Sequence, residues 1–73
     1  MNEIEIRNKL KQISNLVCSD LRIVSIKSYY NGKQIEEIVR FGTITYDENG
    51  IIISKGNREI LWKDVIDVSI YEE

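Results

Sequence analysis

Histidine and proline are absent from this 73-residue sequence, and Cys18 is its only cysteine. A lone cysteine excludes an intrachain disulfide, and without histidine or a second cysteine the common structural zinc sites cannot form. Acyl-transfer triads also need an imidazole or an equivalent base beside the nucleophile. We therefore predict a protein that is not an enzyme, with no catalytic, metal or cofactor site. We expect Cys18 to be a buried, inert thiol.

Long apolar runs are also missing. No run is longer than residues 51–53, three consecutive isoleucines, whereas a helix that spans a bilayer needs about 20 apolar residues. The N-terminal residues include Glu3 and Glu5 and lack the apolar segment of a secretory signal peptide. We therefore expect a cytoplasmic protein without a membrane span, and a free cysteine agrees with that compartment.

A large excess of charge of one sign is missing as well, because the net charge is −2. The sequence through Arg40 has seven basic and five acidic residues, and the remainder has three basic and seven acidic. Proteins that bind nucleic acid usually present a basic face, so we consider that partner unlikely. A nucleic-acid-associated regulator remains an alternative function, in which the contacts would come from Arg7, Lys9, Lys11 and Arg22.

Isoleucine is abundant, at fourteen positions. β-Branched side chains pack well on a pleated sheet and therefore favour strands. The abundance of isoleucine, lysine, asparagine and glutamate is also typical of AT-rich DNA, which points to a bacterium or a phage. The length predicts one domain, residues 1–73, and a domain this small usually needs additional support such as a partner chain.

The first quarter of the chain has the periodicity of a helix. Ile6, Leu10, Ile13 and Val17 follow one another at spacings of four, three and four, which places them on one helix face. This pattern predicts an amphipathic helix over about residues 3–18.

Turn signals divide residues 21–71 into short strands. Asn31-Gly32 is typical of a type I′ hairpin, because that turn needs positive φ at both central residues. Residues 47–50 predict a second hairpin with Gly50 in the left-handed region, and Gly56-Asn57 predicts a third turn. The predicted fold is therefore α+β, an N-terminal amphipathic helix packed on a four- to five-stranded antiparallel β-meander.

These turns also predict strand registers. The first hairpin sets Glu37 opposite Ile26 on an apolar face, and we expect a bulge near Glu36 and Glu37 that turns the carboxylates outward. The second and third turns predict the pairs Tyr46–Ile51, Ile44–Ile53, Ile53–Ile60 and Ile51–Trp62. In this arrangement Trp62 belongs to the core.

The predicted sheet has a second face that is partly apolar and carries Ile52 and Leu61. One short helix covers only one face, so either the sheet curls into a half-barrel or a second chain packs there; as the plain alternative, the two side chains are scattered surface residues. We predict a homodimer, because burial of two such side chains is worth roughly 3–6 kcal/mol. Tyrosine is enriched at interface hot spots. The candidate interface residues are Tyr29, Tyr30, Ile52, Leu61 and Tyr71.

The leading functional hypothesis is a small non-enzymatic interaction or accessory protein that acts through self-association and protein–protein contacts. Its size and composition are typical of small genes of phages or mobile elements. The hypothesis names no partner beyond a second copy of the chain.

Residues 50–53 and 59–68 together resemble the central strands of bacterial PH-like and GRAM-like domains. The shared features are a strand, a turn, an apolar strand that ends in a tryptophan, and a short break before the next strand. The resemblance covers about a third of the chain, which is shorter than a seven-stranded barrel and carries its helix before the strands. It implies a module that binds a peptide or a lipid headgroup, and the acidic second half disfavours an anionic lipid.

Overall fold

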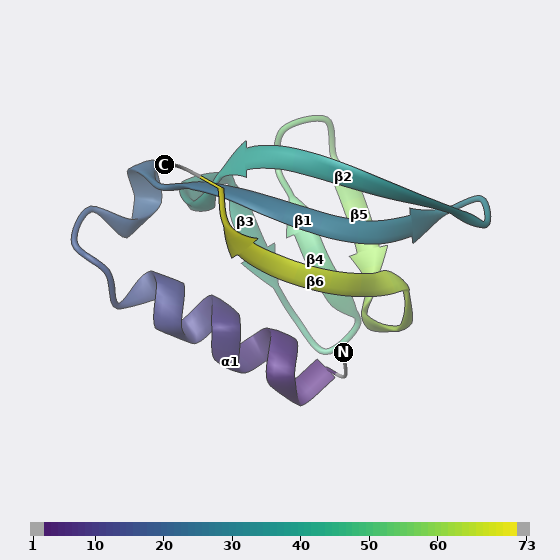
Figure 1. Ribbon diagram of the computed structural model, residues 1–73, viewed down its shortest axis with the longest axis horizontal. Helices are drawn as coiled ribbons and strands as arrows, with labels where there is room; N and C mark the ends of the chain where they lie inside the picture. Colours follow the sequence, from purple (N-terminus) through teal and green to yellow (C-terminus); the bar gives the residue numbers. More distant parts are fainter. Residues whose placement is uncertain (1–2, 72–73) are drawn as a thin grey trace.

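The computed structural model of this protein describes residues 3–71. One helix is followed by six strands: α1 (Glu3–Ser14), β1 (Ile23–Tyr30), β2 (Lys33–Arg40), β3 (Ile44–Tyr46), β4 (Gly50–Ile53), β5 (Arg58–Leu61) and β6 (Val65–Ile70). The strands form two antiparallel three-stranded sheets, with the orders β2-β1-β6 and β3-β4-β5. We call them sheet A and sheet B. In Figure 1, sheet A lies in front of sheet B, and α1 runs beside β6.

The α+β class and the antiparallel strands are confirmed, but the single meander is wrong. After β5, a 3₁₀ turn (Trp62–Asp64) redirects the chain, and β6 returns to pair with β1. The two sheets and the helix then share one core. Its buried apolar side chains are Ile6, Leu10, Ile13, Val24, Ile26, Ile44, Ile51, Ile53, Ile60, Val65 and Val68. Each sheet therefore covers the inner face of the other, while Ile52 and Leu61 stay on the outer face of sheet B.

The helix is shorter than predicted. It ends at Ser14, where backbone bonds from Asn15 N to Gln12 O and from Leu16 N to Ile13 O tighten the last turn. Val17 lies beyond this end and is 83% exposed, so its place on the buried stripe is wrong.

The predicted burial of Cys18 is also wrong. Its side chain is exposed, and the residue has the left-handed φ of 55° where the chain leaves the helix. Cys18 directly precedes a 3₁₀ turn (Ser19–Leu21) that leads into β1. The chain therefore reverses at this point, and the thiol does not face the core.

The first hairpin has the predicted register, but the predicted bulge is absent. Asn31 and Gly32 have φ values of 52° and 78°, as a type I′ turn requires. The pairing of β1 with β2 continues without interruption and sets Glu37 opposite Ile26. The Glu37 carboxylate remains on that side because Arg58 Nε of β5 donates a hydrogen bond to its Oε1 at 2.8 Å. An ion pair between the sheets thus replaces the expected bulge.

An irregularity occurs instead between β1 and β6. The register shifts between Lys27 and Ser28, which pair with Asp67 and Val65, so Ile66 is left without a paired residue. A bulge of this kind bends the strand on which it lies.

Sheet B confirms the second hairpin and corrects the third. Tyr46 pairs with Ile51, as predicted. Across β4 and β5, however, Ile51 pairs with Ile60, because the connecting loop has four residues, 54–57, and shifts the pairing by two positions. A shift of two keeps each side chain on its predicted face. Trp62 consequently falls outside the strand and begins the 3₁₀ turn, although its ring still packs against the core.

Two other features of the sequence can be compared with the structure. The stretch that was compared with PH-like domains contains β4, a turn, β5, the turn Trp62–Asp64 and β6, but its tryptophan begins the second turn and does not end β5. Within residues 3–71, no helix is long and apolar enough to cross a membrane.

Two buried serines of β1 differ in their hydrogen bonds. Ser25 Oγ donates to Glu36 Oε2, whereas Ser28 Oγ has no hydrogen-bond partner within the described chain. A buried hydroxyl without a partner costs about 1–3 kcal/mol. We therefore expect Ser28→Ala to raise the free energy of unfolding by about 1 kcal/mol, measured by urea denaturation.

Ser25→Ala is the matched control, since it removes a hydroxyl that has a partner. It is expected to lower the free energy of unfolding by about 1 kcal/mol. A loss of stability in Ser28→Ala as large as that in Ser25→Ala would contradict this view of Ser28.

Candidate interaction surfaces

The structure distributes the predicted interface residues over separate places. Tyr29 and Tyr30 lie at the end of β1 beside the hairpin turn. Tyr71 lies at the opposite end of β1, where its backbone N–H donates to Ile23 O at 3.0 Å. Ile52 and Leu61 share the outer face of sheet B, where Leu61 is opposite Gly50. These residues therefore do not form one continuous surface.

Their environments differ as well. Tyr29, Tyr30, Leu61 and Tyr71 are exposed, whereas Ile52 is half-buried. The guanidinium of Arg58 lies 4.8 Å from the centre of the Tyr30 ring, so that ring is held by an intrachain cation–π contact.

The longest surface available for a partner is the edge of sheet A at β2. The strand order places β2 and β6 at the two edges. The β6 edge is partly covered by α1, and Lys9 Nζ donates to Asp67 Oδ1 at 2.7 Å across that contact. In contrast, β2 has a strand on one side only, and all eight of its residues are exposed or half-buried.

The hydrogen-bonding direction of β2 follows from one contact at its end. Phe41 N donates to Arg22 O at 2.8 Å, in continuation of the β1–β2 register. Because antiparallel strands alternate between residues that bond to the partner and residues that point away, the odd-numbered residues of β2 face β1. The N–H and C=O groups that point out from the edge belong to Gln34, Glu36, Ile38 and Arg40.

These outward groups are almost all open. Within residues 3–71, the only one that accepts a hydrogen bond from another element is Arg40 O, to which Thr43 Oγ1 donates at 2.7 Å. The side chains of the same residues lie on the outer face of sheet A, and that of Ile38 is 42% exposed. A surface depression of about 240 Å³ adjoins the end of this edge and is lined by Ile23, Ile38, Val39, Arg40, Thr43 and Lys55.

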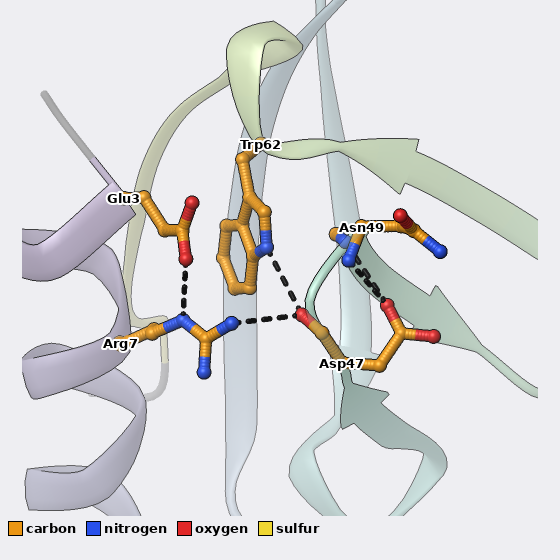
Figure 2. Close-up of polar contacts among 6 residues, drawn as sticks. Glu3, Arg7, Asp47, Asn49 and Trp62 are labelled. Carbon is orange, nitrogen blue, oxygen red and sulfur yellow. Dashed lines mark hydrogen bonds and ion pairs between the residues drawn. The ribbon is translucent and has the colours of Figure 1, made fainter.

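A second group of residues forms a tight cluster around Arg7, which we call the Arg7 cluster (Figure 2). Arg7 Nη2 and Trp62 Nε1 both donate to the backbone carbonyl of Asp47, each at 3.0 Å. Arg7 Nε also donates to Glu3 Oε2 at 2.8 Å. The guanidinium lies 5.0 Å from the Trp62 ring centre and 5.6 Å from that of Tyr46.

The turn that supplies the shared carbonyl is itself fixed. Asp47 Oδ1 accepts hydrogen bonds from Asn49 N at 2.8 Å and Gly50 N at 3.2 Å, as in an Asx turn. Trp62 N donates in addition to Asn49 O. The Arg7 cluster therefore joins α1, the β3–β4 turn and the segment before β6, and its contacts are all within the chain.

These contacts engage two of the basic side chains of α1. Arg7 is engaged in the Arg7 cluster, and Lys9 forms the ion pair with Asp67. Two of the three helix cations that would serve a nucleic-acid contact thus have acidic or backbone partners in the same chain. Among residues 3–71, no group of three or more cysteine, aspartate or glutamate side chains is placed to hold a metal ion.

We expect Arg7→Ala to lower the free energy of unfolding by about 1–2 kcal/mol, because it removes the bond to a backbone carbonyl and two cation–π contacts. Trp62 is the only tryptophan, so a change in its emission spectrum reports the loss of the Arg7 cluster directly. Lys11→Ala, an exposed change on the same helix, is expected to alter neither property. Unchanged tryptophan emission in Arg7→Ala would contradict the packing of Arg7 on Trp62.

Sequence reasoning found the exposed tyrosines but missed the Arg7 cluster and the open edge. Arg7 and Asp47 are separated by 40 positions, so no local pattern connects them. The open edge of β2 depends on the pairing of β6 with β1, and no turn pattern in the sequence predicts that pairing.

Comparisons with protein families, curated proteins and solved structures found no significant match to this chain.

Proposed function

We propose that this protein is a small non-enzymatic interaction module that works by self-association. The observation that carries the proposal is the open edge of β2, where a strand of eight residues has no partner on its outer side. Unpaired N–H and C=O groups on such an edge are a template for another strand.

Proteins that keep an edge strand unpaired usually protect it. A bulge, a proline, a covering helix or charged side chains are common devices, and β2 carries the last of these in Lys33, Glu36, Glu37 and Arg40. The β1–β2 register is continuous, the sequence has no proline, and α1 lies on the opposite edge, beside β6. The edge of β2 therefore retains the regular geometry that strand addition needs.

The outer face of sheet B is the competing surface for the same function. Leu61 is 41% exposed there, and the half-buried Ile52 is its neighbour on that face. Either surface, the β2 edge or the outer face of sheet B, would form an oligomer. Different substitutions would disrupt the two oligomers.

The test is the absolute mass in solution by light scattering after gel filtration, over a dilution series. We expect the mass to rise with concentration from that of the 8.6 kDa chain toward twice that value. A mass equal to one chain at every concentration would overturn the proposal. Leu61→Glu identifies the competing surface, because it should disrupt only an oligomer that uses sheet B.

A further inference from the structure

We propose that the partner of the β2 edge is the β2 edge of a second copy, paired antiparallel about a two-fold axis at Ile38. This inference rests on the proposed self-association and names its interface. Two copies related by a two-fold axis present the same surface to each other, so that surface must be complementary to itself.

The sequence of β2 has this property. On the outer face of sheet A, the strand presents in order an acid, an apolar residue and a base, Glu36, Ile38 and Arg40. An antiparallel pair centred on Ile38 sets each Glu36 opposite the Arg40 of the second copy and sets the two Ile38 side chains together. Opposite charges and apolar pairs at directly opposed positions both stabilise a sheet.

The backbone supports the same register. Glu36, Ile38 and Arg40 are the residues whose backbone groups point away from β1, so Glu36 and Ile38 can bond to the second copy through both N–H and C=O, and Arg40 through its N–H. At Arg40 the N–H is the group available to the second copy, because Arg40 O caps the turn Phe41–Thr43 and accepts from Thr43 Oγ1. The result is a continuous six-stranded sheet made of two copies of sheet A.

Neighbouring registers lack this complementarity. A shift of two residues in one direction sets Ile38 opposite Glu36, and a shift in the other direction sets it opposite Arg40. Each shift removes both ion pairs and opposes an apolar side chain with a charge. Charge complementarity therefore selects one register of this edge and one occupant for it.

The depression beside the edge is consistent with this occupant. Arg40 and Lys55 give its lining a positive charge. In the proposed register, the second copy brings Glu36 to this end of the strand. The same end of the second copy receives the Glu36 of the first, so the interaction occurs twice in one dimer.

The decisive experiment exchanges the charges. Glu36→Arg sets two arginines opposite each other, Arg40→Glu sets two glutamates, and each variant alone is expected to weaken the dimer about tenfold or more. A mixture of the two variants should form a heterodimer, because every opposed pair then has opposite charges. Light scattering and native mass spectrometry measure both effects, and Lys11→Glu controls for the change in net charge of Arg40→Glu.

A second experiment tests the register without depending on charge. In a Cys18→Ser background, Ile38→Cys places two thiols opposite each other, with Cα atoms about 5.5 Å apart, within the range that a disulfide bridges. Glu36→Cys is the matched control, since its two copies would be more than about 13 Å apart along the strands. We expect a covalent dimer from Ile38→Cys only.

The outcomes separate this inference from the proposed function. If the unmodified chain dimerises but both charge variants dimerise equally well and Ile38→Cys does not cross-link, the inference is wrong and self-association stands. If the unmodified chain is monomeric throughout the dilution series, the proposed function itself is wrong. Circular dichroism of each variant confirms that a loss of dimer is not a loss of fold.

Discussion

Gly50→Ala is expected to destabilise the protein by about 3 kcal/mol or more, a large part of the stability of a small domain. Gly50 begins β4 opposite Leu61, and β5 passes so close that a Cβ at this position would lie 2.9 Å from Leu61 Cα. It would come still closer to the carbonyl of Ile60, and neither backbone atom can move without breaking the pairing of the two strands. Urea denaturation, followed by circular dichroism, measures the effect.

The reason for this glycine is therefore different from the one expected. The predicted left-handed conformation is wrong, because the glycines with positive φ in the described chain are Gly32 and Gly56. Gly50 is needed for the close approach of another strand, which a turn pattern does not reveal.

Gly32→Ala is the control for this prediction. Gly32 has a φ of 78°, and a Cβ added there would meet no atom within 4 Å. Its substitution tests conformational strain without a clash, and we expect a cost of about 1–2 kcal/mol. Equal losses of stability in the two variants would contradict the steric argument for Gly50.

Leu10→Ala is the second large expected effect, with a loss of about 2–5 kcal/mol in the free energy of unfolding. Leu10 is fully buried at the centre of the apolar face of α1, between Ile6 and Ile13. The substitution removes three carbons and leaves a cavity in the core that the helix shares with the sheets. For a domain of this size, the melting temperature should fall by roughly 10 °C or more.

Ile4→Ala provides the comparison on the same helix. Ile4 is 70% exposed, so its truncation should change the free energy of unfolding by no more than about 0.5 kcal/mol. A small effect of Leu10→Ala, similar to that of Ile4→Ala, would mean that α1 does not pack on the core as described. The pair thus tests whether the helix is an integral part of the fold.

Local features of this protein could be predicted from local sequence. The buried face of the helix followed from the spacing of Ile6, Leu10 and Ile13, because a helix repeats every 3.6 residues. The first hairpin followed from Asn31-Gly32, because a two-residue turn fixes the register of the strands that it joins. These signals act over a few residues, and the sequence alone determines them.

The interaction surfaces could be predicted only in part. Tyr29 and Tyr30 were predicted only as candidate interface residues, and both are exposed beside the turn. The open edge of β2 did not follow, since it depends on which strand pairs with β1 on its other side. The charge order of Glu36, Ile38 and Arg40 is present in the sequence, but it acquires a meaning only when β2 is known to be an edge.

The arrangement of the two sheets was decided by tertiary structure. The return of β6 to β1, the ion pair between Glu37 and Arg58, and the approach of β5 to Gly50 all join segments that are distant in the sequence. Such contacts form because apolar faces on separate elements must be buried together, and many chain paths satisfy the same local patterns. The sequence by itself determined the elements and their apolar faces, and only the packing of those faces decided which strand pairs formed and that β2 became an edge of sheet A.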